Sequence, residues 1–262
     1  MMNLQSLFSL EGKTALVTGG SRGIGAMIAE GLVTAGCRVY ISSRTAEQCE
    51  KTAERLKDYA GECVPLPGDV SSIEGIEKLV ASLSALENSI DILINNAGVA
   101  WGEPFEKFSE KGWDRVMNLN AKSVFFLTQK MMPLLKRRAS AEDPSRVINI
   151  TSVLGQRPDP MMAYSYCASK AALAQMTKNL AYDLAKDNIT VNGISPGFFP
   201  SQMTAHIMED EEANKAMLSK ARFQRYGKVE EIAGLSIYLC SKSGSYITGD
   251  VIPIDGGLLL AC

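Results

Sequence analysis

Short apolar runs alternate with longer helical stretches along most of the chain. The runs are nearly uninterrupted, which is typical of parallel strands that helices cover on both faces. The stretches between them, such as 25–36 and 46–60, have helical character, and the second has charged faces. Repeated strand–helix units of this kind predict an α/β fold, a doubly wound parallel sheet flanked by helices. The expected strands are 13–18, 37–42, 62–66, 91–95, 146–151, 189–194 and 250–255.

The length of 262 residues suits one large α/β domain, and no long linker, repeat or low-complexity tract marks a second one. We therefore expect a single domain over 1–262. From about 198 to 225 the sequence is helical, Met-rich and without a strand, and it begins just after an expected strand ends. An insertion at that position is placed to cover a site, so we predict a substrate lid there.

Charge and composition argue against several classes of protein. The formal net charge is −2 and the basic residues are scattered, so the chain lacks the basic field that nucleic-acid binding needs. No window approaches about 18 uninterrupted apolar residues, and the start has no secretory signal, so we expect a cytoplasmic protein without a membrane span. The six dispersed cysteines indicate reduced thiols. His206 is the single histidine, so we expect neither a metal site of several imidazoles nor a Ser-His-Asp triad.

A glycine-rich turn, TGGSRGIG at 18–25, follows the first expected strand and leads into a helix. Glycine allows the tight turn and the close approach of a pyrophosphate, which the free N–H groups of the helix then stabilise. The strand before it, the helix after it and its place in the first βα unit together predict a dinucleotide site. The expected contacts are Gly19, Ser21, Arg22, Gly23, Ile24 and Gly25.

The end of the second expected strand predicts which dinucleotide is bound. A site selective for NAD carries an acid there for the ribose 2′-hydroxyl. This chain has neutral Ser43 followed by Arg44, and Arg22 lies within the glycine turn. Two guanidinium groups suit a 2′-phosphate, to which arginine donates in a bidentate manner, so the sequence favours NADP(H) over NAD(H). The alternative is that Arg44 only begins an exposed helix.

The stretch YSYCASK at 164–170 contains a tyrosine and a lysine four residues apart. Residues at that spacing share a helix face, which places Tyr166 beside Lys170, whereas Tyr164 points elsewhere. A cation beside a phenol favours the phenolate and brings its pKa toward the working range. With one histidine in the chain, we interpret Cys167 as a packing thiol rather than a nucleophile.

Ser152 ends the expected strand RVINITS, at the carboxyl edge where open α/β sheets bind ligands. A hydroxyl at that edge can hydrogen-bond a substrate carbonyl. Together with a nicotinamide cofactor, Ser152, Tyr166 and Lys170 make a complete device for transferring a hydride and a proton.

From about residue 9 to 257 the chain resembles the short-chain dehydrogenase/reductase family. The motifs that carry the resemblance occur in the family's order and are TGGSRGIG at 18–25, NNAG at 95–98, Asn120 in NLNAKSVF, Ser152, YCASK at 166–170 and SPG at 195–197. The resemblance implies a seven-stranded Rossmann sheet and a tetrad of Asn120, Ser152, Tyr166 and Lys170. In that family the tyrosine is the general acid/base, and the lysine lowers its pKa and holds the nicotinamide ribose. The serine orients the carbonyl, and the asparagine anchors a water-mediated proton relay.

The same resemblance implies contacts with the cofactor along the rest of the chain. Asp69 and Val70 are expected at the adenine, although Asp69 has an alternative interpretation as a helix cap. The full set of further contacts is Asp69, Val70, Asn96, Ala97, Gly98, Tyr166, Lys170, Pro196, Gly197, Phe199 and Ser201, the last four near the nicotinamide carboxamide.

Within the family, the chain resembles most the bacterial 3-oxoacyl (β-ketoacyl) reductases of the RhlG-like subgroup, which implies lipid metabolism. The segments expected around the substrate are apolar and flexible, which suits an extended apolar molecule. They carry Met161, Met162, Phe198, Phe199, Met203 and Met208. Ordinary packing of the lid is an alternative explanation for the methionine pair.

One departure bears on the partner. Tyr182 stands where reductases of fatty-acid synthesis carry a basic residue for docking acyl carrier protein, although the basic tract 136–138 is present in the other docking region. Carrier protein, coenzyme A thioester and free ketone therefore stay open, as do a sugar or a steroid-like substrate. A nucleotide-binding regulatory protein is the non-enzymatic alternative, which an intact tetrad disfavours. The resemblance also implies a homotetramer, built through the helix that contains Tyr166 and through the C-terminal strand.

Overall fold

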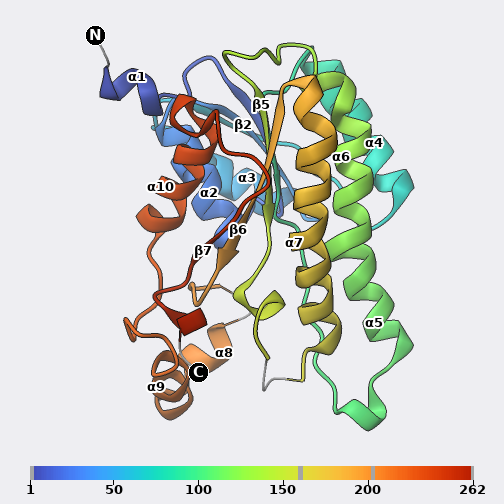
Figure 1. Cartoon of the computed structure of the whole chain (residues 1–262), viewed down its shortest axis with the longest axis vertical. Coiled ribbons are helices and arrows are strands. Elements are labelled where there is room, and N and C mark those ends of the chain that lie inside the picture. The colour runs from blue at the N-terminus through green and yellow to red at the C-terminus, as the bar shows by residue number, and fades with distance from the viewer. Residues whose placement is uncertain (1–2, 159–161, 202–203, 261–262) are drawn as a thin grey trace.

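The computed structural model describes residues 3–158, 162–201 and 204–260. Its seven-stranded sheet is parallel throughout, with the order β3-β2-β1-β4-β5-β6-β7 and helices on both faces (Figure 1). The strands are β1 (Thr14–Thr18), β2 (Arg38–Ser42), β3 (Glu62–Pro65), β4 (Ile92–Asn95), β5 (Ser145–Ile150), β6 (Ile189–Pro196) and β7 (Val251–Ile254). The doubly wound sheet and each expected strand are confirmed, with strand ends that differ by one or two residues from the expected ones.

The helices form two layers around this sheet. One face is covered by α2 (Gly23–Thr34), α3 (Ala46–Arg55) and α10 (Val229–Cys240), the other by α4 (Ile73–Leu86), α6 (Ser123–Leu135) and α7 (Tyr164–Leu184). Shorter helices are α1 (Leu4–Phe8), α5 (Glu110–Met117), α8 (Ala205–Met208) and α9 (Glu211–Leu218). Single helical turns are η1 (Phe105–Lys107), η3 (Val153–Gly155), η4 (Ala185–Asp187), η5 (Lys242–Gly244) and η6 (Leu258–Leu260).

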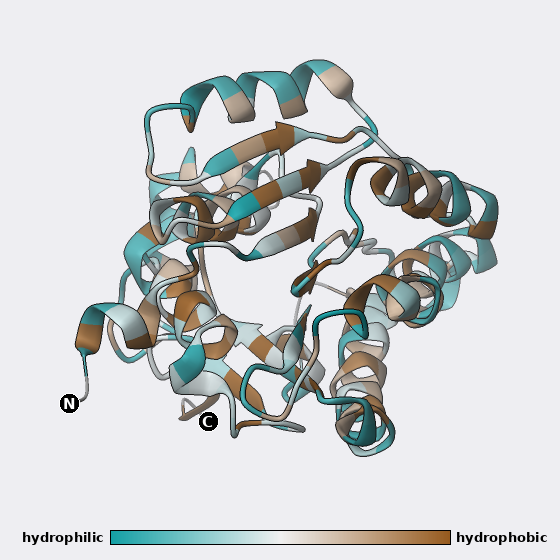
Figure 2. Ribbon diagram, turned by 90° about the horizontal axis from the view of Figure 1, so that it is seen from above, coloured by the Kyte–Doolittle hydropathy of each residue, from teal (hydrophilic) through white to brown (hydrophobic). Residues whose placement is uncertain are grey.

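Two hydrophobic cores lie between the layers because successive residues of a strand point to opposite faces. In β1, Ala15 and Val17 pack into the core that includes Leu32 of α2, whereas Leu16 packs into the core that includes Leu127 of α6. All five of these residues are at most 2% exposed. Figure 2 shows the apolar strands enclosed by helices with hydrophilic outer turns. This double coverage explains why the strands read as uninterrupted apolar runs.

Side chains just before several helices satisfy the free N–H groups of the first turn. Ser72 accepts a hydrogen bond from Gly75 N (3.1 Å) at the start of α4. Asp210 accepts one from Ala213 N (3.0 Å) at the start of α9. Ser and Asp at these positions are strong local signals for a helix start, so these helices begin where local sequence directs them.

A π-helical turn, η2 (Asn118–Lys122), joins α5 to α6. Such a turn holds one residue more than an α-helical turn and is frequent at functional sites. It places the Asn120 side chain inside the protein, where it is fully buried. The motif that contains Asn120 did not predict the π geometry.

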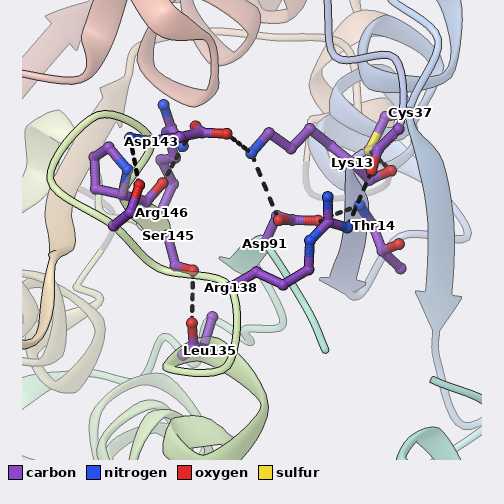
Figure 3. A network of polar contacts seen from close by, with 12 residues as sticks. Lys13, Thr14, Cys37, Asp91, Leu135, Arg138, Asp143, Ser145 and Arg146 are labelled. Carbon is purple, nitrogen blue, oxygen red and sulfur yellow. Dashed lines mark hydrogen bonds and ion pairs between the residues drawn. The ribbon is translucent and has the colours of Figure 1, made fainter. Parts of the chain in front are cut away.

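At the amino edge of the sheet, charged side chains brace the strand starts (Figure 3). Lys13 pairs with Asp91 (3.5 Å) and also with Asp143, and Asp91 accepts a hydrogen bond from Thr14 N (2.9 Å). Arg146 is fully buried and donates to Asp143 Oδ1 (2.6 Å) and to the carbonyl of Ser241 (3.2 Å). These contacts join the starts of β1, β4 and β5 to the corner after α10, away from the carboxyl edge.

The expected lid segment, 198–225, holds α8 and α9 and no strand among its described residues. None of the helices in the described ranges is both long enough and apolar enough to span a membrane.

Candidate active site

Gly19 and Gly25 of the glycine turn have no room for a side chain, and two of the turn's glycines need the left-handed backbone. Gly19 and Gly23 have φ angles of 64° and 53°, in the left-handed region that favours glycine. A Cβ on Gly25 would lie 2.3 Å from the Gly19 carbonyl oxygen, and one on Gly19 would lie 2.8 Å from Asn96 Nδ2. Arg22, just before α2, makes no capping bond with its side chain. The first-turn N–H groups of α2 therefore face an open position suited to a phosphate group.

Thr18, the last residue of β1, ties the glycine turn to the end of β4. Its hydroxyl oxygen accepts hydrogen bonds from Asn96 N and Ala97 N, both at 3.1 Å, and its hydroxyl donates to Ile94 O (3.3 Å). The Asn96 amide in turn donates to Thr18 O (2.9 Å) and Gly19 O (3.1 Å). The β1–β4 crevice is the topological switch point of this sheet, where open α/β sheets bind ligands. The sequence analysis missed Thr18, although it opens the TGGSRGIG motif.

Arg22 and Arg44 are both exposed, and neither forms an ion pair with another residue of the described ranges. Between them, Ser43 O accepts from Gly68 N (3.0 Å), which brings the segment before Asp69 to the end of β2. The Ser42 hydroxyl is buried without a hydrogen-bond partner among the described residues. Two unpaired guanidinium groups beside the end of β2 are the donor set that a phosphate monoester requires.

Asp69, expected at the adenine, was also open to interpretation as a helix cap. Asp69 Oδ1 accepts from Ser71 N (2.9 Å), but Ser72 caps α4, so the alternative interpretation of Asp69 as the helix cap is wrong. Val70 is 8% exposed and packs in the core on the α4 side.

Asn120, Gly98 and Lys170 lie together beneath the carboxyl edge. The Asn120 side chain accepts from Val99 N (2.9 Å) and donates to Val99 O and Ser169 Oγ, both at 3.0 Å. A Cβ on Gly98 would lie 3.2 Å from Asn120 Oδ1 and 3.7 Å from Lys170 Nζ. The NNAG segment, the π-helical turn and α7 therefore meet at one point.

On α7, the Lys170 ammonium lies 5.6 Å from the centroid of the Tyr166 ring and donates to Ile150 O (2.7 Å). Lys170 is buried, and this burial lowers its pKa to about 8. Ser169 Oγ donates to Tyr166 O (2.7 Å) while accepting from Asn120, so it connects the tyrosine turn to the π-helical turn. The sequence analysis gave Ser169 no role, because its hydrogen bond with Asn120 depends on contact between two helices.

Ser152 begins the turn η3, which packs directly on α7. Its hydroxyl oxygen accepts from Leu154 N (3.2 Å), and a Cβ on Gly155 would lie 2.7 Å from Ala171 N. This close packing holds the serine turn against the helix turn that carries Lys170. The four side chains of the expected tetrad are thus gathered on neighbouring segments at the carboxyl edge.

After β6 the chain returns to the glycine turn. A Cβ on Gly23 would lie 3.5 Å from Ser201 Cβ, so the two segments face each other. Phe199, expected near the nicotinamide and in the apolar pocket, is 3% exposed and packs in the core on the α2 side, with its ring against Gly227. Only its backbone can face a cofactor. The aromatic ring is buried here because Gly227 leaves room for it.

The remaining pocket expectations have different outcomes. Met161 and Met203 lie outside the described residues, and nothing is described of the His206 side chain. Met162 and Met208 are 43% and 41% exposed. Tyr164 packs edge-to-face on Phe105 and Phe108.

Comparison with known proteins agrees with this geometry. A family model described as "Enoyl-(Acyl carrier protein) reductase" matches residues 19–259. The chain is 51% identical over 253 residues to a rhamnolipid-biosynthesis 3-oxoacyl-[acyl-carrier-protein] reductase of Pseudomonas aeruginosa, covering 97% of this chain and 98% of the relative. It is 34% identical over 260 residues to a gluconate 5-dehydrogenase of Gluconobacter oxydans, covering 99% and 100%.

Among solved structures, an RhlG/NADP active-site complex of Pseudomonas aeruginosa is 50% identical and superposes with a TM-score of 0.95, over 99% of this chain and 100% of that one. Both relatives and the solved structure are matched over nearly their full length. On this agreement of sequence, fold and motif order, the chain belongs to the short-chain dehydrogenase/reductase family.

Proposed function

We propose that this protein is an NADPH-dependent reductase that converts the 3-oxo group of a 3-oxoacyl thioester to a secondary alcohol. The observation that carries the proposal is the buried ammonium of Lys170 beside the Tyr166 ring, 5.6 Å from its centroid, at the carboxyl edge of the sheet. The substrate class is supported by the name of the relative that is 51% identical, a 3-oxoacyl-[acyl-carrier-protein] reductase.

The residues present fit NADPH. The left-handed glycines and the open N-terminus of α2 suit its pyrophosphate, and the unpaired Arg22 and Arg44 suit its 2′-phosphate. We expect Asn96, Ala97 and Gly98 along the cofactor and Gly197 and Ser201 near its carboxamide. When bound, this cofactor supplies the hydride that the carbonyl carbon receives.

The side chains of the tetrad then have separate tasks. Tyr166 donates a proton to the carbonyl oxygen, and the Lys170 ammonium favours the phenolate that this step leaves. The Ser152 hydroxyl, 8% exposed at the start of η3, donates a hydrogen bond to the same oxygen. Asn120 has both side-chain polar atoms engaged with Val99 and Ser169, so its side chain acts by positioning α7 and the NNAG segment.

The rival class of substrate is a keto sugar acid, because a gluconate 5-dehydrogenase is 34% identical to the chain. The non-enzymatic alternative, a nucleotide-binding regulator, is disfavoured because it has no chemical need for a buried lysine beside a tyrosine at the nucleotide site. A panel of 3-oxoacyl thioesters, small ketones and keto sugar acids, followed by loss of NADPH absorbance, distinguishes these classes.

Replacing Tyr166 with Phe tests the assignment, and Tyr164→Phe on the same helix turn is the matched control. Positioned acid–base groups contribute about 10²- to 10⁴-fold in rate, so Tyr166→Phe should lose about that much turnover while NADPH affinity is kept. Tyr164→Phe should retain turnover. Normal turnover by Tyr166→Phe would show that another group donates the proton.

We also infer a homotetramer and a cytoplasmic location. The first is supported by the partly exposed apolar residues of β7 and by Tyr246 and Tyr182, which are 103% and 87% exposed in the single chain. The second rests on the dispersed cysteines, five of which are free thiols among the described residues. Tyr182 stands in place of the expected basic docking residue, which weakens the case for acyl carrier protein and makes a thioester of coenzyme A an equal candidate.

A further inference from the structure

A third hydrophobic cluster lies apart from the two cores of the sheet. Val153 of η3, Ala221 after the lid helix α9 and Leu258 of the C-terminal turn η6 are each 2% exposed and pack together. Leu154, Phe198 and Leu259 pack against them and stay only partly buried. We call these last three residues the apolar wall.

Two residues of the apolar wall, Leu154 and Phe198, lie close along the chain to the groups that we expect to react. Leu154 is two residues beyond Ser152, and its N–H donates to the Ser152 hydroxyl oxygen at 3.2 Å. Phe198 directly follows Gly197, whose N–H donates to Ile254 O (3.0 Å) at the end of β7. Because consecutive Cα atoms lie about 3.8 Å apart, both wall residues lie within two residues of groups proposed to contact the carbonyl or the nicotinamide.

The turn that supplies Leu259 has its polar groups satisfied internally. Asp255 accepts hydrogen bonds from Gly257 N (2.9 Å) and Leu259 N (2.8 Å), one with each carboxylate oxygen. Arg157 donates to Leu258 O (2.6 Å), which fastens the turn to the segment that follows η3. With its backbone engaged in this way, the turn offers leucine side chains to its surroundings.

We propose that Leu154, Phe198 and Leu259 hold the alkyl chain of the substrate and thereby favour 3-oxoacyl thioesters with a long alkyl chain over short ones. This inference rests on the proposed function. Each methylene buried against the wall favours binding by about fourfold. A keto sugar acid carries a hydroxyl on nearly every carbon, and these hydroxyls would lose their hydrogen bonds with water against such a surface. The wall therefore discriminates between the two substrate classes found among the relatives.

The wall also connects the substrate to the lid. Ala221 packs in the same cluster and comes three residues after α9 ends at Leu218. An alkyl chain bound to the apolar wall therefore makes apolar contacts that exist only while η3, η6 and the lid are packed together. Coverage by the lid and retention of the alkyl chain are thus stabilised together.

The test is the dependence of kcat/KM on chain length in the full-length protein. The substrates are 3-oxobutanoyl, 3-oxooctanoyl and 3-oxodecanoyl thioesters of coenzyme A, with saturating NADPH. The variants are Leu259→Ala, Leu259→Met as the conservative change, and Leu260→Ala as the matched control. Leu260 is on the same turn, is 75% exposed and is absent from the cluster. NADPH affinity reports whether each variant is folded.

We expect kcat/KM of the wild type to rise with chain length. Leu259→Ala should lower it by at least about tenfold for the decanoyl substrate, since several methylenes lose their contact, and by less than about twofold for the butanoyl substrate. Leu259→Met should restore the preference, and Leu260→Ala should match the wild type. The proposal is contradicted if Leu259→Ala loses kcat/KM equally at every chain length. It is also contradicted if kcat/KM of Leu259→Ala rises with chain length as steeply as that of the wild type.

The two proposals fail differently. If the wild type reduces the thioesters but Leu259→Ala has the same chain-length preference, the apolar wall does not hold the alkyl chain, and the proposed function stands. If the wild type reduces a keto sugar acid and none of the thioesters, the proposed substrate class is wrong and the wall fails with it.

Discussion

Lys170 is a residue whose position suits chemistry better than stability. Its ammonium is buried with the Ile150 carbonyl as a hydrogen-bond acceptor, and burial lowers its pKa from 10.5 to about 8. Below pH 8 the folded protein therefore holds a charge away from water. Sites of this kind commonly sacrifice stability for function.

Lys170→Met should stabilise the protein at pH 7 by about 2 kcal/mol while abolishing turnover. The lowered pKa corresponds to roughly 3 kcal/mol, and the lost bond to Ile150 O offsets roughly 1 kcal/mol. Between pH 8 and 10.5 the lysine is neutral when folded and charged when unfolded, so the unfolded state binds more protons and wild-type stability rises with pH. Urea unfolding of both proteins at pH 7 and 9.5 should show the gap shrinking.

Lys178→Met, an exposed position on the same helix, is the control and should show no comparable change of the gap with pH. A gap between Lys170→Met and wild type that is constant from pH 7 to 9.5 would contradict the lowered pKa.

Arg44→Ala should weaken NADPH binding by about ten- to hundredfold, the range for a hydrogen bond to a charged group, and leave NADH binding nearly unchanged. Arg44 is exposed and free of ion pairs among the described residues, so its loss removes no structural contact of that kind. Fluorescence titration with both nucleotides measures the difference. Arg55→Ala is the matched control: Arg55 ends α3 and loses only its ion pair with Glu30 of α2 (2.7 Å). Equal losses for NADPH and NADH would exclude a role in binding the 2′-phosphate.

At the scale of elements, the two ends of the lid contact each other. We call these ends its stems: the first is Phe198 and Phe199, and the second is Tyr226 and Gly227. Gly227 N donates to Phe198 O (2.8 Å), and the Phe199 ring lies where a side chain at Gly227 would be. The Tyr226 hydroxyl donates to Asn214 Oδ1 (2.6 Å), which ties α9 to the second stem. The described part of the lid contains the short helices α8 and α9, which cannot be stable alone and depend on such ties.

Tyr226→Phe should loosen the lid without unfolding the sheet. One hydrogen bond contributes about 0.5–1.5 kcal/mol, so KM for the thioester should rise by about two- to tenfold, and limited proteolysis between α8 and Tyr226 should become faster. Tyr59→Phe also loses a bond from a tyrosine hydroxyl to a side chain, Glu30 (3.1 Å), but far from the lid. The same KM and cleavage rate in both variants would show that the Tyr226 bond does not hold the lid.

At the scale of the whole molecule, the two edges of the sheet carry polar groups in different states. At the carboxyl edge, Arg22, Arg44 and the Ser42 hydroxyl lack partners among the described residues. At the amino edge, Lys13, Asp91, Asp143 and Arg146 form ion pairs with one another, although Arg146 Nε has no hydrogen-bond partner among the described residues (Figure 3). The ligand edge is thus left open for a bound molecule, and the opposite edge joins the layers.

Asp143→Asn should remove a stabilising contact that depends on pH. Burial works against the ionised carboxylate, but the hydrogen bonds from Lys13 and Arg146 outweigh it, so the net effect lowers the Asp143 pKa. A lowered carboxylate pKa stabilises the fold above the unfolded pKa, about 3.9, and this stability is lost as pH falls through the folded value. We expect a loss of about 2 kcal/mol at pH 7, modest because Asp143 is partly exposed.

The loss should shrink on acidification, as chemical unfolding from pH 7 down to 3 would measure. Glu74→Gln removes an exposed pair with Lys78 (2.6 Å) and is the control; solvent screening should leave its effect on stability close to zero. An Asp143→Asn variant as stable as this control would contradict the role of the amino-edge contacts.

Much of the fold and site could be predicted because the signals are local. The strands are apolar runs, the glycine turn needs glycine for steric reasons, and Tyr166 and Lys170 share a helix face by spacing alone. The burial of Phe199 could not be predicted, because it depends on Gly227, which lies 28 residues further along the chain. The polar role of Ser169 likewise depends on Asn120, which another helix supplies.

The sequence by itself thus determined the doubly wound sheet, the place of the nucleotide turn and the pairing of Tyr166 with Lys170, since each follows from periodicity or from backbone sterics over a few residues. Only the tertiary structure decided the lowered pKa of Lys170, the engaged side chain of Asn120 and the apolar wall of Leu154, Phe198 and Leu259. Burial, hydrogen-bond satisfaction and contact between distant segments arise when the layers pack, and no local pattern encodes them.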